Sequence, residues 1–357
     1  MRQKSSSVYQ SVIVVVLCGL LAAGGCATLG WYGQAARGQM ELLLKRKDIE
    51  KLIAAPDTPE RKREKLELVL AVREFAGERL GLPDNGSYSG FVSLDRDAVV
   101  YNVIAAPEFS VQPKTWCYPL VGCLAYRGYF DRGAAERRAA KLADAGYDTL
   151  VSPVAAYSTL GRFDDPVTSP MLEFGETRLA GLLFHELAHQ RVFVKGETAF
   201  NEAYATAVER EGLQRWLLHR QGPETLADRA RSRRLEENFT GLLLEARGEL
   251  DALYARDLPA ERMRAEKRAV FERLRQRYAE FMQAGDDRFD AWMQRDLNNA
   301  HLALLATYEA GTDAFADLLA ECDGDFERFH QAVERLAAAG QKTRAEFLNR
   351  CRIDSCP

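Results

Sequence analysis

The sequence predicts an α+β protein in which a small β-sheet is preceded and followed along the chain by helical segments. Residues 83–86, Pro-Asp-Asn-Gly, break the chain after two helical patterns. Short stretches rich in β-branched and aromatic residues follow between residues 98 and 160, as is typical of strands. Beyond residue 223 the apolar spacing is that of long, charged, amphipathic helices. These changes place a small sheet between two helical regions.

The first helices and the strands are predicted from residue spacing and type. Apolar residues with a helical period predict helices over residues 34–53 and 60–82. The predicted strands, all short, cover residues 98–105, 110–116, 122–126 and 147–160. A stretch rich in Ala and charge predicts a helix over residues 133–145.

Two further helices are predicted from their end signals. Ser169 as N-cap and Pro170 in the first turn begin a helix that reaches about residue 194. Gly196 ends it with a left-handed residue, and Thr198 caps a second helix that continues to about residue 220. The rest of the chain is predicted to be helical to about residue 348, with breaks near residues 259, 285 and 324.

Length and composition describe an ordinary globular protein. The chain has 357 residues, of which 47% are hydrophobic and 28% charged, so it can bury a large core in one or two domains. The net charge is −4, and Lys and Arg alternate with Asp and Glu, so nucleic acid is not expected as a partner. The predicted segments are residues 1–25, 26–84, 85–220 and 221–357.

Residues 1–25 have the order of an export signal. Arg2 and Lys4 precede an apolar run over residues 12–23, which is too short for a membrane-spanning helix, and small residues then precede Cys26. This order predicts a lipoprotein signal, with cleavage before Cys26 and a lipid on its thiol that anchors the protein to a membrane. The alternative is ordinary cleavage with Cys26 left free. Ala27, rather than Asp, favours the periplasmic face of an outer membrane in the cell envelope.

Export would place the remaining cysteines in an oxidising compartment. Cys117 and Cys123 flank a turn-like spacer of five residues and are expected to form a disulfide. The pairing of Cys322, Cys351 and Cys356 stays open.

A His-Glu-x-x-His run at residues 185–189 carries the clearest chemistry. Residues four apart on a helix lie about 40° apart around its axis, so His185 and His189 can reach one metal ion. Glu186 would lie beside it and could take a proton from a metal-activated water. The pattern therefore predicts one catalytic Zn²⁺ per chain, with Glu186 as general base.

A catalytic zinc site needs a third protein ligand and an open position. Glu202, 13 residues after His189, is the best candidate, because a tight turn at Gly196 would fold its helix back along the first as a helical hairpin. Glu197 is expected to interact with a helix dipole, and Glu209 to support the site or face solvent. His219 could ligate in principle but lies near a charged helix end.

At these residues the sequence resembles a bacterial lipoprotein family described as predicted aminopeptidases, within the broad gluzincin-like zinc peptidases. The shared stretches are residues 25–29, 34–39, 106–110, 114–117, 128–131, 157–161, 163–166, 184–190 and 200–202. The resemblance implies a zincin-like catalytic domain with a peptide substrate, His185, His189 and Glu202 as zinc ligands, and Glu186 as catalytic base. The gap to Glu202 is shorter here than in thermolysin-like enzymes.

Other groups could complete such a site. Tyr157 and Tyr308 are candidates to stabilise an oxyanion, with half-buried packing as the alternative for both. Glu197, Asp164 and Asp165 could each hold a substrate amine. The competing hypothesis is a non-catalytic envelope scaffold with a structural metal and partner-binding helices, against which Glu186 argues, because a structural zinc site has no use for it. A cell-wall amide would be a third kind of target.

Overall fold

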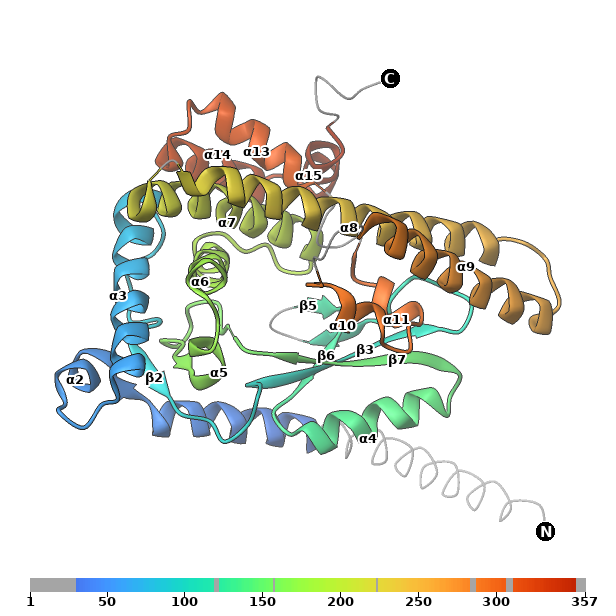
Figure 1. The fold of residues 1–357 in the computed structure, drawn as a ribbon, viewed down its shortest axis with the longest axis horizontal. Helices are drawn as coiled ribbons and strands as arrows, with labels where there is room; N and C mark the ends of the chain where they lie inside the picture. The colour runs from blue at the N-terminus through green and yellow to red at the C-terminus, as the bar shows by residue number, and fades with distance from the viewer. Residues whose placement is uncertain are drawn as a thin grey trace, which may run out of the picture.

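The computed structural model describes residues 30–118, 122–156, 158–222, 224–282, 287–305 and 311–350, apart from the side chains of residues 221, 224 and 226. It confirms the α+β class, with small sheets among many helices (Figure 1). The predicted export signal, Cys26, Tyr157 and Tyr308 lie outside the described residues, as do Cys351 and Cys356. Within these residues, no helix combines the length and the apolar character needed to cross a membrane.

The N-terminal part is helical with short strands. A helix over residues 30–45 comes first. The elements that follow are β1 (Lys47–Asp48), α2 (Ile49–Ala54), α3 (Glu60–Leu80) and β2 (Gly90–Val92). The predicted helix over residues 34–53 is thus divided, because Lys47 and Asp48 leave the helix to pair with Phe91 and Gly90 of β2.

The middle of the chain holds the sheets. Its elements are β3 (Val100–Pro107), β4 (Trp116–Tyr118), β5 (Gly122–Leu124), β6 (Arg127–Tyr129), α4 (Arg132–Ala143), β7 (Tyr147–Val154) and β8 (Val167–Thr168). The strand orders are β6-β3-β7, β1-β2-β8 and β4-β5. β3 and β7 pair antiparallel along their full length, from Val100↔Val154 to Pro107↔Tyr147. In Figure 1, α4 lies below this central sheet.

The predicted strand over residues 110–116 was wrong for most of its length. Only Trp116 is in a strand. Val111 is fully buried against two C-terminal helices, α8 (Glu224–Tyr254) and α9 (Ala260–Phe281), and Pro113 has no N–H with which to continue a ladder. Tertiary packing therefore outweighs the local strand propensity at this point.

The metal motif lies in the next group of helices. These are α5 (Ser169–Leu172), α6 (Glu176–Arg191) and α7 (Thr198–Gln221). One continuous helix was expected from residue 169, but the chain breaks at residues 173–175, where Gly175 is extended (φ −63°, ψ 161°) and begins α6. Lys65 of α3 donates to the Phe174 carbonyl oxygen at 2.6 Å, which fixes this break against the core.

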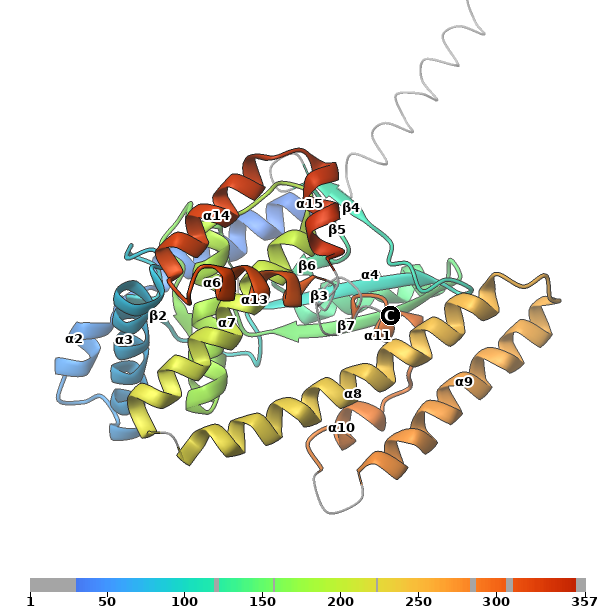
Figure 2. The ribbon, with the colours of Figure 1, turned by 90° about the horizontal axis from the view of Figure 1, so that it is seen from above.

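The C-terminal part is helical, as predicted. Its elements are α8 (Glu224–Tyr254), α9 (Ala260–Phe281), α10 (Asp290–Met293), α11 (Asn299–Leu302), α13 (Thr312–Glu321), α14 (Phe326–Ala338) and α15 (Gln341–Leu348). α8 and α9 lie side by side as a long hairpin (Figure 2). Lys267 of α9 binds Asp148 of β7 at 2.5 Å, and Arg264 binds Glu108 at 2.6 Å, so the hairpin is tied to the central sheet.

The largest hydrophobic core joins segments far apart in the sequence. It packs α3, α6 and α7 together with α13, α14 and α15, and Phe184, Trp216, Phe315 and Phe329 are among its fully buried side chains. His330 of α14 is buried within this core. Its Nε2–H donates to the Leu80 carbonyl oxygen at 2.7 Å, and its Nδ1 accepts from the Tyr204 hydroxyl at 2.9 Å. One neutral imidazole therefore links α14, the end of α3 and α7.

We expect this imidazole to make stability fall in acid. Burial lowers the pKa of His330 to about 4, below its ordinary value. The pKa of His330 is lower in the folded than in the unfolded protein. Its contribution to the free energy of unfolding, about 3 kcal/mol, is therefore complete above about pH 6.5 and is lost as pH falls through about 4. Urea unfolding from pH 7 to pH 4 should show this loss in the wild type and a smaller one in His330→Gln. Equal losses in the two proteins would contradict the prediction.

Candidate metal centre

The α6–α7 hairpin positions the metal motif. Gly196 has φ +80°, the left-handed conformation that favours Gly, and turns the chain between the two helices. Asn201, only 2% exposed, closes the turn from the other side: its Oδ1 accepts from Val194 N–H and its Nδ2 donates to Val194 O, both at 2.8 Å. Because Asn201 precedes Glu202, these two bonds also set the start of α7 against the end of α6. The predicted N-cap Thr198 is the first helical residue instead, after Glu197.

The hairpin brings the three predicted ligands together. His185 Nε2 lies 3.1 Å from His189 Nε2 and 3.3 Å from Glu202 Oε2, and the third separation, from His189 Nε2 to Glu202 Oε2, is 3.7 Å. Two ligands placed about 2.0–2.1 Å from a tetrahedral zinc ion lie about 3.3–3.4 Å apart. The three donor atoms therefore already form a triangle of the size that one such ion requires.

The electrostatics of this triangle favour positive charge. Although burial opposes its protonation, Glu202 and Glu209 raise the pKa of His185 to about 10. Burial also opposes ionisation of Glu202, yet hydrogen bonds to His185 and His189 lower the pKa of this carboxyl to about 2. The negative charges that hold this proton would also attract a divalent cation, and the cation would displace the proton when it binds.

Glu209 of α7 orients the first histidine. Its Oε2 lies 3.1 Å from His185 Nδ1, so Nδ1 keeps its hydrogen and Nε2 is the ring nitrogen that would lose its proton to bind an ion. Gly181, one turn before His185, makes room for this contact: a Cβ at Gly181 would lie 3.1 Å from Glu209 Oε1 and 3.0 Å from a Leu213 methyl. His189 differs, because its Nδ1 is buried without a hydrogen-bond partner among the described residues.

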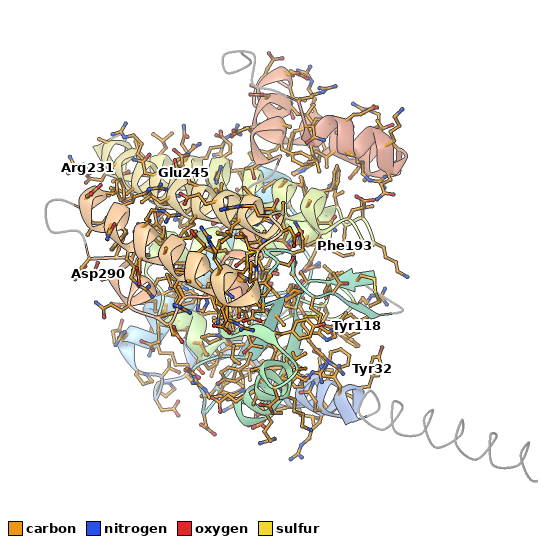
Figure 3. The ribbon with its side chains drawn as sticks, turned by 90° about the vertical axis from the view of Figure 1, so that its right-hand side faces the viewer. Tyr32, Tyr118, Phe193, Arg231, Glu245 and Asp290 are labelled. Atoms are coloured by element: carbon orange, nitrogen blue, oxygen red, sulfur yellow. A yellow bond between two sulfur atoms is a disulfide. The ribbon has the colours of Figure 1, made fainter. Side chains whose placement is uncertain are left out.

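A disulfide hairpin supports the α6–α7 turn. Cys117 and Cys123 are bonded and join β4 to β5. Gly122, with φ +85°, meets Gly196 so closely that a Cβ on Gly122 would lie 3.0 Å from the Gly196 Cα and N. Figure 3 shows Tyr118 of this hairpin and Phe193 of the turn on one side of the molecule. The two glycines allow a backbone-to-backbone contact just beyond the ends of the ligand-bearing helices.

A loop over residues 158–165 packs against α6, since a Cβ on Gly161 would lie 3.5 Å from Gln190 Oε1. Asp165, 1% exposed, accepts from Thr159 N–H at 2.9 Å and Thr159 Oγ1 at 2.7 Å. Burial raises the pKa of Asp165 to about 6, the Thr159 bonds oppose this, and the negative charge of Glu186 adds to it.

A family model described as "Putative aminopeptidase" matches residues 30–348. The chain belongs to this family. The comparisons with curated proteins and with solved structures each gave no match. Membership of the aminopeptidase family supports a peptidase activity, and the match covers the N-terminal helices, the sheets and the C-terminal helices as well as the metal motif.

Other residues proposed for an aminopeptidase site are engaged elsewhere. Glu197 binds Arg344 at 3.2 Å, and Asp164 binds Arg46 at 3.4 Å. The His219 ring lies 5.5 Å from the Phe75 ring rather than in the ligand triangle. The third candidate for binding a substrate amine, Asp165, already accepts hydrogen bonds from Thr159 with both oxygens.

Replacement of Glu209 by Gln should weaken metal binding without removing a ligand. An amide oxygen is a poorer acceptor than a carboxylate for the His185 N–H, and such supporting changes weaken metal affinity by about 10–100-fold. Zinc titration against a competing chelator would measure the change in the purified protein. Glu211→Gln is the matched control, since Glu211 binds Arg215 on the same helix at 2.8 Å. Equal affinity in Glu209→Gln and the wild type would show that Glu209 does not support the metal.

Proposed function

We propose that the protein is a zinc-dependent aminopeptidase of the gluzincin type, with a zincin-like catalytic domain. The single observation that carries the proposal is the triangle of His185 Nε2, His189 Nε2 and Glu202 Oε2, with Glu186 next to His185 on the same helix. Membership of the aminopeptidase family supports the same conclusion. One Zn²⁺ per chain would be held by these three side chains, which leaves a fourth position open.

Two carboxylates of the chain, Glu186 and Glu209, would then have separate roles in the reaction. When bound, zinc acts as a Lewis acid and lowers the pKa of a water molecule to about 7. Glu186, partly exposed on α6, accepts the proton of the attacking water and delivers it to the nitrogen of the leaving amine. Glu209 keeps His185 in the tautomer whose Nε2 lone pair faces the ion. The substrate would be a peptide with a free amino terminus.

The test uses the full chain, purified in detergent. Elemental analysis should find about one zinc per chain, and the protein should release the first residue of a peptide with a free amino terminus. The same peptide acetylated at its amino terminus should resist cleavage. Cleavage of both peptides would identify an endopeptidase, and stable zinc with no hydrolysis of either would favour the scaffold hypothesis.

We further propose that the protein is a lipoprotein at the periplasmic face of the outer membrane, anchored through Cys26. The proposal rests on the export-signal pattern of residues 1–25 and on Ala27. Mass spectrometry of the N-terminal peptide should find a diacylglyceryl group on Cys26. An unmodified thiol there would contradict the anchor.

A further inference from the structure

Tyr88 is held in a strained position next to the catalytic helix. Its φ is +59°, in the left-handed region that bulky residues avoid, and its side chain is 1% exposed. The Tyr88 N–H donates to the Asp165 carbonyl oxygen at 2.6 Å, which helps to hold this conformation. Strain of this kind persists where the surrounding structure enforces it, and it is concentrated at functional sites.

The turn that carries Tyr88 is docked on α6. Asn85 Nδ2 donates to Gln190 Oε1 at 2.8 Å, and Gln190 Nε2 donates to Ser87 Oγ at 3.3 Å. Gln190 is four residues after Glu186, so the two side chains emerge from the same face of the helix. The turn therefore lies against this face of α6, and the Tyr88 backbone is bonded to Asp165.

The Tyr88 hydroxyl has no hydrogen-bond partner among the described residues, although it is buried. Burial raises the pKa of Tyr88 well above its ordinary value, and the carboxylates of Glu186 and Asp165 add to this. Both Asp165 oxygens accept hydrogen bonds from Thr159, whereas among the described residues no hydrogen bond to the partly exposed Glu186 carboxylate is present. A buried hydroxyl without a partner is costly, and Phe in its place would pack as well.

We propose that Tyr88 is a positioning residue for Glu186: its hydroxyl donates to the Glu186 carboxylate through one water molecule. The bond holds the carboxylate in the orientation from which it takes the proton of the attacking water. Tyr88 itself does not touch the substrate, since its side chain is closed off from solvent. This inference rests on the proposed function, because the role of Glu186 as general base belongs to it.

Tyr88→Phe tests the proposal, because it removes the hydroxyl alone. We expect kcat to fall about 10–100-fold, the loss associated with one hydrogen bond to a charged group, while KM and zinc content stay unchanged. The thermal midpoint should fall by only a few degrees, so that the variant stays folded in the assay. Tyr254→Phe is the matched control: its hydroxyl donates to Asn299 at 2.8 Å, away from the metal motif, and kcat should stay unchanged.

A double-mutant cycle provides a second measurement that needs no activity. If the hydroxyl donates to Glu186, Tyr88→Phe and Glu186→Gln should be non-additive in the free energy of unfolding of the metal-free protein. Additive effects, an unchanged kcat in Tyr88→Phe, or a Tyr88→Phe protein that fails to fold would each overturn the role of Tyr88. Wild-type protein that binds no zinc and cleaves no peptide would instead overturn the proposed function.

Discussion

Replacement of Glu186 by Gln is expected to lower kcat by about 10²–10⁴-fold while zinc stays bound at one ion per chain. Gln has nearly the same shape as Glu but cannot accept a proton at neutral pH, so the loss measures general-base catalysis. The metal should remain because His185, His189 and Glu202 are untouched. Removing the charge also relieves its repulsion of Asp165, so the folded protein should not be weakened by electrostatics.

Steady-state hydrolysis and elemental analysis of the same preparation would measure both quantities. Glu173→Gln is a suitable control, since that carboxylate is 72% exposed and pairs only with Arg61 at 3.1 Å in the described structure. Unchanged kcat in Glu186→Gln would remove Glu186 from the mechanism. Loss of zinc together with activity would show that the substitution disturbs the ligands instead.

Replacement of Glu202 by Ala is expected to weaken zinc binding by about 10²–10³-fold. Structural zinc sites with four ligands bind with about 10–16 kcal/mol, or about 2.5–4 kcal/mol for each ligand. Glu202 is the only carboxylate in the ligand triangle, and its side chain is 13% exposed, so water would replace it poorly. In the metal-free variant, His185 would lose its contact with Glu202. Glu209 would then be the carboxylate that stays hydrogen-bonded to the positively charged ring.

Zinc affinity by chelator competition would measure this loss, with activity restored in part at high zinc concentration. Glu211→Ala provides the control on the same helix, because its partner is Arg215 rather than a ligand. Full affinity in Glu202→Ala would remove Glu202 from the ligand set. Activity that excess zinc does not restore would indicate a further role for this carboxylate.

Much of the centre could be predicted because it depends on local geometry. Two histidines four residues apart share a helix face whatever surrounds them, and the structure has both on α6. A Gly at residue 196 indicates a tight turn, and the antiparallel return of α7 then follows. The short spacer between Cys117 and Cys123 likewise indicated the disulfide that joins β4 to β5.

The remaining part of the centre depends on segments distant in the sequence. Asn85 and Gly86 indicated a turn, but not that this turn would dock on Gln190 and bury Tyr88 near Glu186. The fully buried His330 resembles any other His in the middle of a charged helix, and only the packing of α3, α7 and α14 gives it two partners. Such contacts leave no periodic pattern or fixed spacing in the sequence.

The sequence by itself determined the three residues proposed as ligands, the helix that carries two of them and the turn that returns the third. Those features follow from backbone periodicity and from the conformational freedom of Gly, which act over a few residues. Only the tertiary structure decided that Glu209 rather than solvent faces His185, that Gly122 meets Gly196, and that the turn before Tyr88 docks on Gln190. These contacts depend on which distant segments pack together, because packing decides which polar atoms are buried away from water and need a partner.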